Sequence, residues 1–538
     1  MSRRIGLRPA LVLAFLLGAT PAAGQTAAPN AAAEALARHL SLGTGTVSER
    51  DAELLVVLAK FYQERQMAPL WLDADGPSAR AEVLAKVLRD ADQDGLDPED
   101  YHASTITELL STGTPDQRAE LELRLSLGLL EMTSDLASGR LEPQKVNPEL
   151  FVYPQEVDPA KVIRSAAGAQ DIAAFVASYE PKQAEYLRLK AALTDYRALA
   201  AAGGWPTIAD GPTLKPGMTD PRVAQLRARL GVPAPQGGNS ALFDPALVEA
   251  VKQFQARHGL EQDGVVGQNT LAALNVPVED RVRQILLNLE RRRWMADDPG
   301  KRYVFVNLAD FELKLVEEPH TVFDTRVVIG APYRRTPVFS GNMTYLELNP
   351  YWNVPPSIAR NELLPKIKAD PGYLAANDFQ LLSDWSDNAR VLDPHAIDWS
   401  AVRADTFTYK VRQGPGPGNA LGHVKFMFPN QFNIYLHDTP ARGLFAREVR
   451  DFSHGCIRVQ APETLAAFVL DRQPGWSEGQ INAAIATGQR QIITLSQPLP
   501  VHIAYLTAWV NKDGSVNFRR DVYGRDAILA AALFGPQA

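Results

Sequence analysis

The hydrophobic pattern of this 538-residue chain changes its period at about Tyr303. Before that residue, apolar side chains recur three and four positions apart, as in Leu54, Leu58 and Phe61, which is the spacing of one helix face. From Tyr303 onward, apolar and polar residues alternate, which is typical of half-buried strands. At about 150 residues per domain, a chain of this length is expected to form three or four domains. The pattern therefore predicts a multidomain α+β protein whose carboxy-terminal half is rich in strands.

The amino-terminal half is interrupted by a segment dense in glycine and proline, residues 203–221, which is predicted to be a linker. Residues 30–202 are rich in Ala, Leu, Glu and Arg and are expected to form a helical domain. In residues 211–276, periodicity predicts two or three short helices separated by glycine turns. A connecting helix is expected within 277–300. The basic triplet Arg291–Arg293 at its end is interpreted as a solvated terminus, where cations suit the helix dipole.

Residues 301–538 are expected to form one β-rich domain. Alternation predicts a hairpin over residues 303–316. Between about 355 and 422 the pattern turns helical and then loop-like, and so long a stretch inside a β domain is usually a functional insertion or lid. Further short strands are expected at residues 325–329, 344–348, 432–436 and 492–494.

Charge and hydropathy argue against nucleic acid as a partner and limit any membrane contact to the amino terminus. The net charge of −7 and the isoelectric point near 5.8 give no broad positive field, so nucleic acid is not expected to bind. Residues 1–24 combine early arginines with a short apolar run and small residues, which predicts a cleaved signal peptide, with an uncleaved amino-terminal anchor as the alternative. No later segment reaches the roughly 18 unbroken apolar residues of a membrane helix.

Cys456 is the one cysteine of the chain. An exported protein with a single thiol is expected to use it in an intermolecular bridge or as a reactive group, although a buried, inert cysteine is the alternative. Two histidines lie near it in sequence: His437 is nineteen positions earlier and His454 two positions earlier. Either imidazole is a candidate partner that would activate the thiol.

The residues beside Cys456 also suit acyl transfer. Gly455 leaves room for backbone N–H groups, including that of Cys456, to form an oxyanion hole. Arg458 is a candidate for holding a substrate carboxylate. A zinc site would need three or four ligands at suitable spacing, so neither a metal nor another cofactor is expected.

Two stretches resemble known families. FDPALVEAVKQFQARHGLEQDGVVGQNTLAALN, within residues 211–276, resembles the small three-helix peptidoglycan-binding module of cell-wall enzymes. IYLHDTP at 434–440 and SHGCIRV at 453–459 resemble the signature of the L,D-transpeptidase catalytic domain, known as the YkuD fold. Together with the helical amino-terminal region, these motifs resemble the large periplasmic subgroup typified by YcbB. The resemblance implies a YkuD-type domain with an inserted lid, preceded by a helical scaffold domain and the module.

The resemblance also implies roles for individual residues. It makes Cys456 the nucleophile and His437 the general base. The other implied positions divide into support for the reacting groups and contacts with substrate. Support is implied for Gly455, His454 and Arg458, with Tyr435 near the oxyanion site. Either Ser453 or a backbone carbonyl is expected to orient a histidine. Substrate contacts are implied for Arg458, Trp352 and Asn419.

The implied reaction joins peptidoglycan stems through 3→3 cross-links, by way of a thioester between Cys456 and a donor tetrapeptide stem. A hydrolase of the same fold, which would trim stems, and a non-catalytic wall-binding scaffold are the alternatives. The expected partners are stem peptides, glycan strands and other enzymes of wall synthesis. The expected location is the periplasm of a Gram-negative cell, with attachment to the inner membrane if the signal is not cleaved. Carbapenems, which acylate such thiols, are implied inhibitors.

Overall fold

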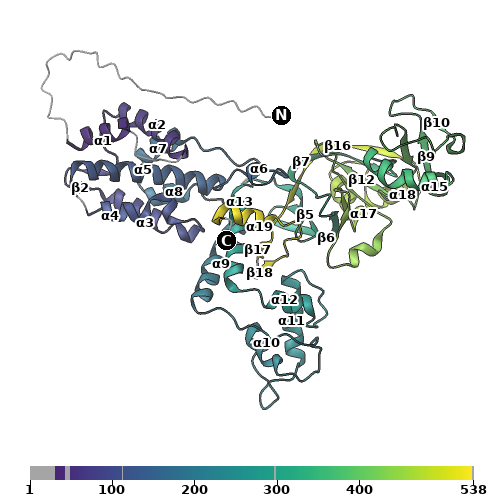
Figure 1. The fold of residues 1–538 in the computed structure, drawn as a ribbon, viewed down its shortest axis with the longest axis horizontal. Helices are drawn as coiled ribbons and strands as arrows, with labels where there is room; N and C mark the ends of the chain where they lie inside the picture. Colours follow the sequence, from purple (N-terminus) through teal and green to yellow (C-terminus); the bar gives the residue numbers. More distant parts are fainter. Residues whose placement is uncertain (1–30, 43–48, 112, 296–297, 536–538) are drawn as a thin grey trace.

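The computed structural model describes residues 31–42, 49–111, 113–295 and 298–535. The predicted signal peptide, residues 1–24, lies outside the described residues. Three arms extend from a central helix pair, as Figure 1 shows: a helical arm, a small helical module and a strand-rich arm. Within the described ranges, no helix combines the length and the apolar composition that crossing a bilayer requires.

The helical arm surrounds one long buried helix, α5 (Pro115–Ser138). Thr114 and Gln117 form a capping box at its start, which satisfies backbone N–H groups that the first turn would leave unpaired. Its leucines are buried on nearly every side because shorter helices pack all around it. The expected helical domain is thus present. The surrounding helices are α1 (Ala31–Leu42), α2 (Glu49–Glu64), α3 (Ala79–Arg89), α4 (Ala103–Leu109), α7 (Pro159–Gly168) and α8 (Ile172–Ala177).

The small module contains three helices, as expected: α10 (Arg222–Leu230), α11 (Pro245–Arg257) and α12 (Gln268–Leu274). Its core includes Phe243, Val251 and Phe254. Gln255 is 1% exposed, and its side chain accepts from the Gly264 N–H at 2.9 Å while donating to the Val265 carbonyl at 2.9 Å. One buried amide therefore joins α11 to the glycine turn that follows it.

The strand-rich arm is built on a sheet that closes on itself, because β12 pairs with β13 on one side and with β7 on the other. Around the resulting barrel the strand order is β12-β13-β15-β6-β5-β4-β16-β7. Closure removes exposed sheet edges. The strands are β4 (Arg302–Asn307), β5 (Glu312–Glu317), β6 (His320–Gly330), β7 (Val338–Leu348), β12 (Val424–Met427), β13 (Leu436–His437), β15 (Ile457–Val459) and β16 (Gln491–Ala504).

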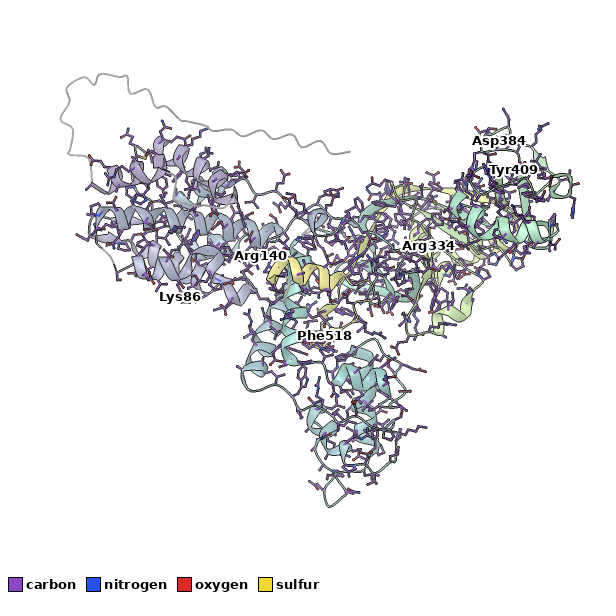
Figure 2. The ribbon with its side chains drawn as sticks, in the orientation of Figure 1. Lys86, Arg140, Arg334, Asp384, Tyr409 and Phe518 are labelled. Carbon is purple, nitrogen blue, oxygen red and sulfur yellow. The ribbon has the colours of Figure 1, made fainter. Side chains whose placement is uncertain are left out.

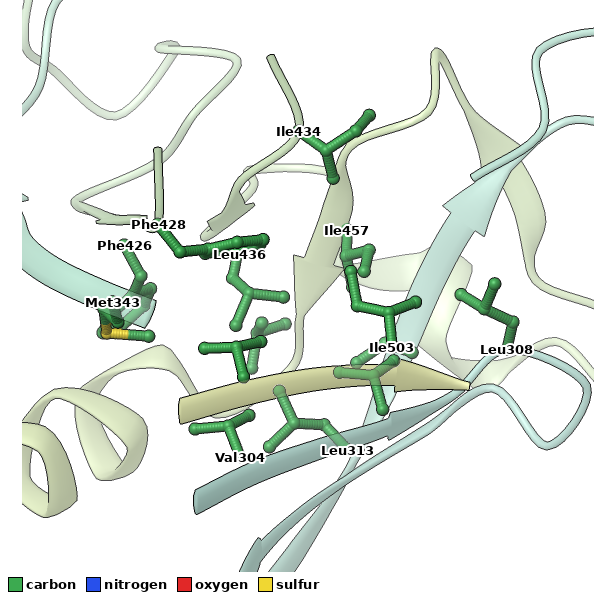
Figure 3. Close-up of a cluster of buried hydrophobic side chains, with 14 of the residues drawn as sticks. Val304, Leu308, Leu313, Met343, Phe426, Phe428, Ile434, Leu436, Ile457 and Ile503 are labelled. Carbon is green, nitrogen blue, oxygen red and sulfur yellow. The ribbon is translucent and has the colours of Figure 1, made fainter. Parts of the chain in front are cut away.

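Alternate side chains of these strands fill the barrel interior. Val304, Leu313, Phe426, Leu436 and Ile457 are all fully buried there, and Figure 3 shows them converging on one cluster. Because strand side chains alternate between faces, the residues between them point to the outside of the barrel. The outer surface therefore carries the polar residues of the same strands.

The predicted hairpin is confirmed, since β4 and β5 pair antiparallel with Val304 opposite Leu315. The expected strand at 432–436 is wrong for most of its length, because β13 covers only Leu436–His437. Asn430 explains the difference. Its side chain donates to the Ile434 carbonyl at 2.8 Å and accepts from the Phe432 N–H at 3.0 Å. These backbone groups are therefore not available to pair with a neighbouring strand.

The insertion between β7 and β12 is a small folded unit, whereas the sequence predicts a helical and then loop-like segment. It contains a four-stranded sheet of order β10-β9-β11-β8 and its own buried cluster around Leu374 and Val411. Asp384 and Tyr409 mark it at the far end of the strand-rich arm in Figure 2. Its elements are β8 (Trp352–Asn353), α14 (Pro356–Ile358), the π-helix η3 (Ala359–Leu363), α15 (Leu364–Ala369), α16 (Tyr373–Ala376), β9 (Phe379–Leu382), β10 (Val391–Leu392) and β11 (Lys410–Gln413).

Two helices, α9 (Ala184–Ala201) and α13 (Val278–Arg293), pack together where the arms meet, and α13 also contacts the carboxy-terminal helix α19 (Arg525–Phe534). Near them, β17 (Ala508–Val510) and β18 (Val516–Phe518) form a separate hairpin. Figure 1 shows these elements gathered at the centre of the molecule. The centre thus joins helices from the amino-terminal half to the last segments of the chain.

The prediction that Arg291–Arg293 form a solvated helix end is wrong. Arg291, Arg292 and Arg293 are 7%, 8% and 2% exposed. Nη1 of Arg291 donates to Asp526 at 2.6 Å, and Nη1 of Arg293 donates to Glu290 at 3.4 Å. The end of α13 is buried because α9, α19 and the barrel pack around it, so side-chain partners replace the water that the sequence interpretation assumed.

Candidate active site

Cys456 lies in the turn between β14 (Asp451–Ser453) and β15, and its side chain is half-buried. β15 runs parallel to β13, with Leu436 beside Ile457, and the Ile457 N–H donates to the Tyr435 carbonyl at 3.1 Å. Leu436 and Ile457 point into the barrel. The residues next to them therefore share the outer face. These are Tyr435, His437, Cys456 and Arg458, so the structure brings four predicted site residues together.

His437 is held as a neutral imidazole. It is 4% exposed, and burial, with lesser effects from Arg458 and Lys425, lowers the pKa of His437 to about 3. Its Nδ1 lies 2.5 Å from the Asp438 carbonyl oxygen. Since a carbonyl only accepts, Nδ1 carries the proton and Nε2 keeps a free lone pair. The imidazole is thereby prepared to accept a proton.

The thiol of Cys456 is also neutral at rest. Burial raises the pKa of Cys456, while hydrogen bonds from Tyr435 and the charges of Lys425 and Arg458 act in the opposite direction. Its Sγ lies 3.7 Å from the Asn433 carbonyl oxygen, which is the geometry of a thiol that donates weakly. A neutral thiol on the same face as a neutral base implies that the proton moves when the sulfur attacks, and not before.

This resting state predicts an unusual alkylation profile. At pH 7.4, iodoacetamide should modify Cys456 more slowly than it modifies N-acetylcysteine, because less thiolate is present when the pKa is raised. The rate should continue to rise above pH 9. Mass spectrometry of the intact protein over time measures this rate at each pH. A plateau from pH 5 to pH 8 would instead reveal a preformed thiolate–imidazolium pair and contradict the assignment.

A row of charged side chains crosses the outer face beside the thiol, and sequence reasoning missed it. In register across the strands, Glu347 of β7 lies beside Lys425 of β12, which lies beside His437. Lys425 Nζ is 3.9 Å from Glu347 and 4.4 Å from the ring centroid of Tyr435. Arg490 pairs with Glu347 at 2.7 Å. The sequence signal for this row was that polar Lys425 alternates with the apolar Val424 and Phe426. The residues that Lys425 contacts, however, come from distant parts of the chain.

Gly455 and Ser453 shape the turn that carries the thiol. Gly455 has φ of +111°, and a Cβ there would lie 3.2 Å from Ile434 Cδ1, so glycine suits this position. Ser453 Oγ donates to the Cys456 carbonyl at 2.5 Å and accepts from the Gly455 N–H at 3.1 Å. The Gly455 amide is therefore occupied. Among the residues that the structure describes, the Cys456 N–H has no acceptor, and it is the candidate oxyanion donor.

Of the two groups expected to orient a histidine, the Ser453 hydroxyl makes its hydrogen bonds within the turn. The backbone carbonyl of Asp438 orients His437 instead. The Asp438 carboxylate accepts from the His423 N–H at 2.8 Å and the Thr439 N–H at 2.7 Å, which fixes that carbonyl. Sequence reasoning assigned no role to Asp438, although it lies within the IYLHDTP motif.

A second set of contacts supports the turn from beneath. Thr336 Oγ1 donates to the Gly455 carbonyl at 2.8 Å and accepts from the Gly330 N–H at 3.0 Å. Tyr523, near the carboxy terminus, donates to the Gly330 carbonyl at 2.6 Å. The carboxy-terminal segment thus holds in place the turn that carries Cys456.

His454 faces the insertion. Its Nε2 lies 2.5 Å from Oε1 of Glu362, in the π-helix η3, and the same carboxylate accepts from Arg334 at 3.0 Å. Arg334 lies on the strand-rich arm in Figure 2. Among the described contacts, the hydrogen bond of His454 goes to Glu362 and none goes to Cys456, so direct support of the sulfur by His454 stays a prediction. The Glu362 carboxylate of the insertion therefore contacts both His454 and Arg334 of the barrel arm.

Two substrate contacts were predicted in or next to the insertion. Asn419 is 1% exposed, and its side chain donates to the Pro350 carbonyl at 2.9 Å and accepts from the Leu421 N–H at 2.7 Å. Backbone groups therefore occupy its amide, and its contact with substrate stays a prediction. Trp352 is half-buried, with its ring centroid 6.0 Å from that of Phe379, and its contact with substrate stays a prediction. Across the described residues, no group of three or more His, Cys, Asp or Glu is arranged as a metal site.

Comparison with known families shows which kind of domain carries this outer face. The model described as "L,D-transpeptidase catalytic domain" matches residues 301–482, which include Cys456, the insertion and every strand of the barrel except β16. The chain therefore carries an L,D-transpeptidase catalytic domain. A model described as "Putative peptidoglycan binding domain" matches residues 220–274, and a model described as "Scaffold domain" matches residues 57–193.

A relative supports the same assignment. A "Putative L,D-transpeptidase" from Haemophilus influenzae is 36% identical over 244 residues, which are 45% of this chain and 48% of that protein. The match thus spans about half of the length of this curated relative. Among solved structures, an L,D-transpeptidase from Stackebrandtia nassauensis matches at 14% identity over 55% of this chain and 96% of its own, with a TM-score of 0.21. One from Xylanimonas cellulosilytica matches at 15% identity over 55% and 99%, with a TM-score of 0.16. At these scores the two structures add no support to the assignment.

Proposed function

We propose that this protein is an active L,D-transpeptidase that joins peptide stems of peptidoglycan through a thioester on Cys456. The observation that carries the proposal is the outward group formed by Cys456 and His437, in which a neutral imidazole with a free nitrogen lies on the same face as the thiol. A structural cysteine would need neither a free base nor a glycine turn.

In the first half-reaction, the Cys456 proton passes to Nε2 of His437 while Sγ attacks a carbonyl carbon of the donor stem. The developing oxyanion accepts a hydrogen bond from the Cys456 N–H. Collapse of the tetrahedral intermediate breaks the C–N bond, and His437 returns the proton to the departing amine. In the family, the attacked carbonyl belongs to the third residue of a tetrapeptide stem, and the departing group is its terminal D-alanine.

In the second half-reaction, an amine of another stem attacks the thioester. His437 removes a proton from this amine, the new C–N bond forms, and the C–S bond breaks. The sulfur takes the proton back from His437, which restores the starting thiol. The product is a 3→3 cross-link when the acceptor amine belongs to the third residue of its own stem. Two successive acyl transfers predict ping-pong kinetics.

The domains and charges fit a substrate in the cell wall. Residues 220–274 match a peptidoglycan-binding domain, which would hold glycan or stem near the catalytic domain. Arg458 is half-buried on the face of Cys456 and could pair with a stem carboxylate. The wall lies outside the cytoplasm, so we place the protein in the periplasm, consistent with the predicted signal.

Product analysis tests the proposed function. Purified protein is incubated with disaccharide tetrapeptide, and the products are separated and weighed by mass spectrometry. Cross-linked dimers are the expected result. Trimmed monomers would identify a hydrolase, and unchanged substrate would identify a scaffold. Either of those results would overturn the proposal.

The insertion would act as a lid, and Glu362 is its clearest contact with the barrel arm. We expect Glu362→Gln to raise the KM for donor stem about threefold to tenfold, with a smaller effect on kcat, because half-exposed ion pairs contribute about 0.2–1 kcal/mol each. Steady-state kinetics measure both constants. Asp405→Asn is the matched control: Asp405 is also in the insertion and pairs with Arg403 at 3.1 Å, on an exposed surface. An equal effect of both variants would remove the special role of Glu362.

A further inference from the structure

A cavity of about 790 Å³ lies where α9, α13, β17 and the barrel meet. Figure 1 shows where these elements come together. On the barrel it is lined by outward side chains of β4 and β5, including Tyr303, Phe305 and Lys314. In the strand order of the barrel, β15 and β6 lie between β13, which carries His437, and β5. In the other direction, β12, β7 and β16 lie between β13 and β4. None of the four outward residues around Cys456 lines this cavity. It is therefore a separate site from the one that holds the thiol.

The cavity contains a buried cation without a partner. Arg292 lines it and is 8% exposed, and its Nε has no hydrogen-bond partner among the described residues. No ion pair of Arg292 is found among those residues either. Burial lowers the pKa of Arg292, while the charge of Glu185 acts in the opposite direction from beyond ion-pairing distance. An uncompensated buried guanidinium is costly, so a native structure that keeps one usually supplies an anion from elsewhere.

The other two arginines of the cavity wall are already engaged. Arg291 pairs with Asp526 at 2.6 Å, and Arg188 pairs with Glu185 at 3.3 Å. On the barrel, Lys314 pairs with Glu312 at 3.2 Å. Between β17 and β18, Lys512 donates to a backbone carbonyl at 2.6 Å, and Lys301 lines the cavity from an exposed position. Arg292 is therefore the buried guanidinium of the wall that is still available to an incoming anion.

The remaining lining indicates the class of ligand. Apolar and aromatic groups, including Phe305, Phe339 and Trp509, offer contact area, and the volume is within the roughly 300–1,000 Å³ of small-ligand sites. Several carboxylates also line the wall, among them Glu185 and Glu318. They would repel a multiply charged phosphate, whereas a single carboxylate on a larger, partly apolar molecule avoids most of that repulsion. A guanidinium matches a carboxylate with two parallel hydrogen bonds.

From these observations we infer that the cavity between α9, α13 and the barrel binds the carboxyl end of a short peptide, with the terminal carboxylate on Arg292. The site is independent of catalysis at Cys456 and does not require the proposed reaction to be correct. Because the cavity is lined by α9 of the amino-terminal half and by β4 of the barrel, a bound peptide would contact both parts of the chain.

Isothermal titration of the full chain carrying Cys456→Ala tests the inference without interference from acyl transfer. The probes are N-acetyl-trialanine, its carboxy-terminal amide, acetate and inorganic phosphate. We expect saturable binding of the peptide acid and at least tenfold weaker binding of the amide. Acetate should bind more weakly than the peptide because it lacks the apolar part. No binding of the peptide acid, equal binding of the amide, or tighter binding of acetate or phosphate than of the peptide would overturn the inference.

Substitution of Arg292 supplies a second test of the inference. Arg292→Met should weaken binding of the peptide acid at least tenfold, and it should leave the melting temperature without peptide unchanged or higher, because it removes an unpaired buried charge. Arg291→Met is the matched control, since Arg291 is equally buried on the same helix but paired with Asp526. That variant should lower the melting temperature. A large loss of stability in Arg292→Met, or unaltered peptide binding by it, would show that Arg292 has a structural role only.

Discussion

Replacing Cys456 with alanine should abolish formation of cross-linked dimers, with a loss of at least about 10⁴-fold in kcat/KM for the donor stem. The reason is chemical: no other cysteine exists in the chain to form a thioester. The half-buried side chain loses only its sulfur, so the melting temperature should change little. Cross-linking assayed by chromatography and mass spectrometry measures the loss, and the melting temperature confirms that the variant is folded.

The same variant tests the covalent step by a second route. Intact-protein mass spectrometry of the wild type with a carbapenem should reveal one added mass, formed when the thiol opens the lactam ring. The alanine variant should show none. An adduct that persists on Cys456→Ala, or dimer formation that survives in it, would remove the thiol from the mechanism.

Replacing His437 with glutamine should lower the rate of acylation by about 10²–10⁴-fold, which is the usual contribution of a positioned general base. Glutamine keeps a polar group of similar size but cannot take the proton from Sγ. Because burial and nearby cations lower the pKa of His437 to about 3, the wild-type imidazole stays neutral, and competent as a base, at every pH well above 3. The acid limb of acylation by the wild type should therefore lie below pH 5, and not near the usual histidine value of about 6.5.

Stopped-flow measurement of acylation across pH 4 to pH 9 checks both statements. His258→Gln is the matched control, because His258 is half-buried, also has a pKa lowered chiefly by burial, and bonds through Nδ1 to a backbone carbonyl at 2.8 Å. It lies in the small module, so its replacement should leave acylation by a soluble donor unchanged. An acid limb near pH 6.5, or an equal loss in both variants, would contradict the assignment of His437.

The features of the site that could be predicted from the sequence are those that short motifs encode. The identity of Cys456, the glycine before it and a histidine nineteen positions earlier could be stated from the sequence, because each depends on residue type and local spacing. Residue type and spacing alone did not choose between His437 and His454, and only the resemblance to the YkuD signature named His437. The parallel register of β13 and β15 turns Tyr435, His437, Cys456 and Arg458 to the same side of the barrel.

Hydrogen-bond partners are the part of the site that local patterns did not predict. His454 is two residues from the thiol, yet its hydrogen bond goes to Glu362, 92 positions away. Asn419 has the chemistry of a substrate contact, but the fold commits its amide to backbone groups. In each case the local pattern was compatible with several partners, and tertiary packing selected one.

By itself, the sequence determined the division into a helical half and a strand-rich half, the hairpin at β4 and β5, the three-helix module and the chemical identity of the thiol. These follow from periodicity and from residue types that act locally. Tertiary structure alone decided the neutral state of His437, the burial of Arg291–Arg293 and the cavity around Arg292. Burial and charge pairing depend on which distant segments come together, and a pattern of neighbouring residues does not contain that information.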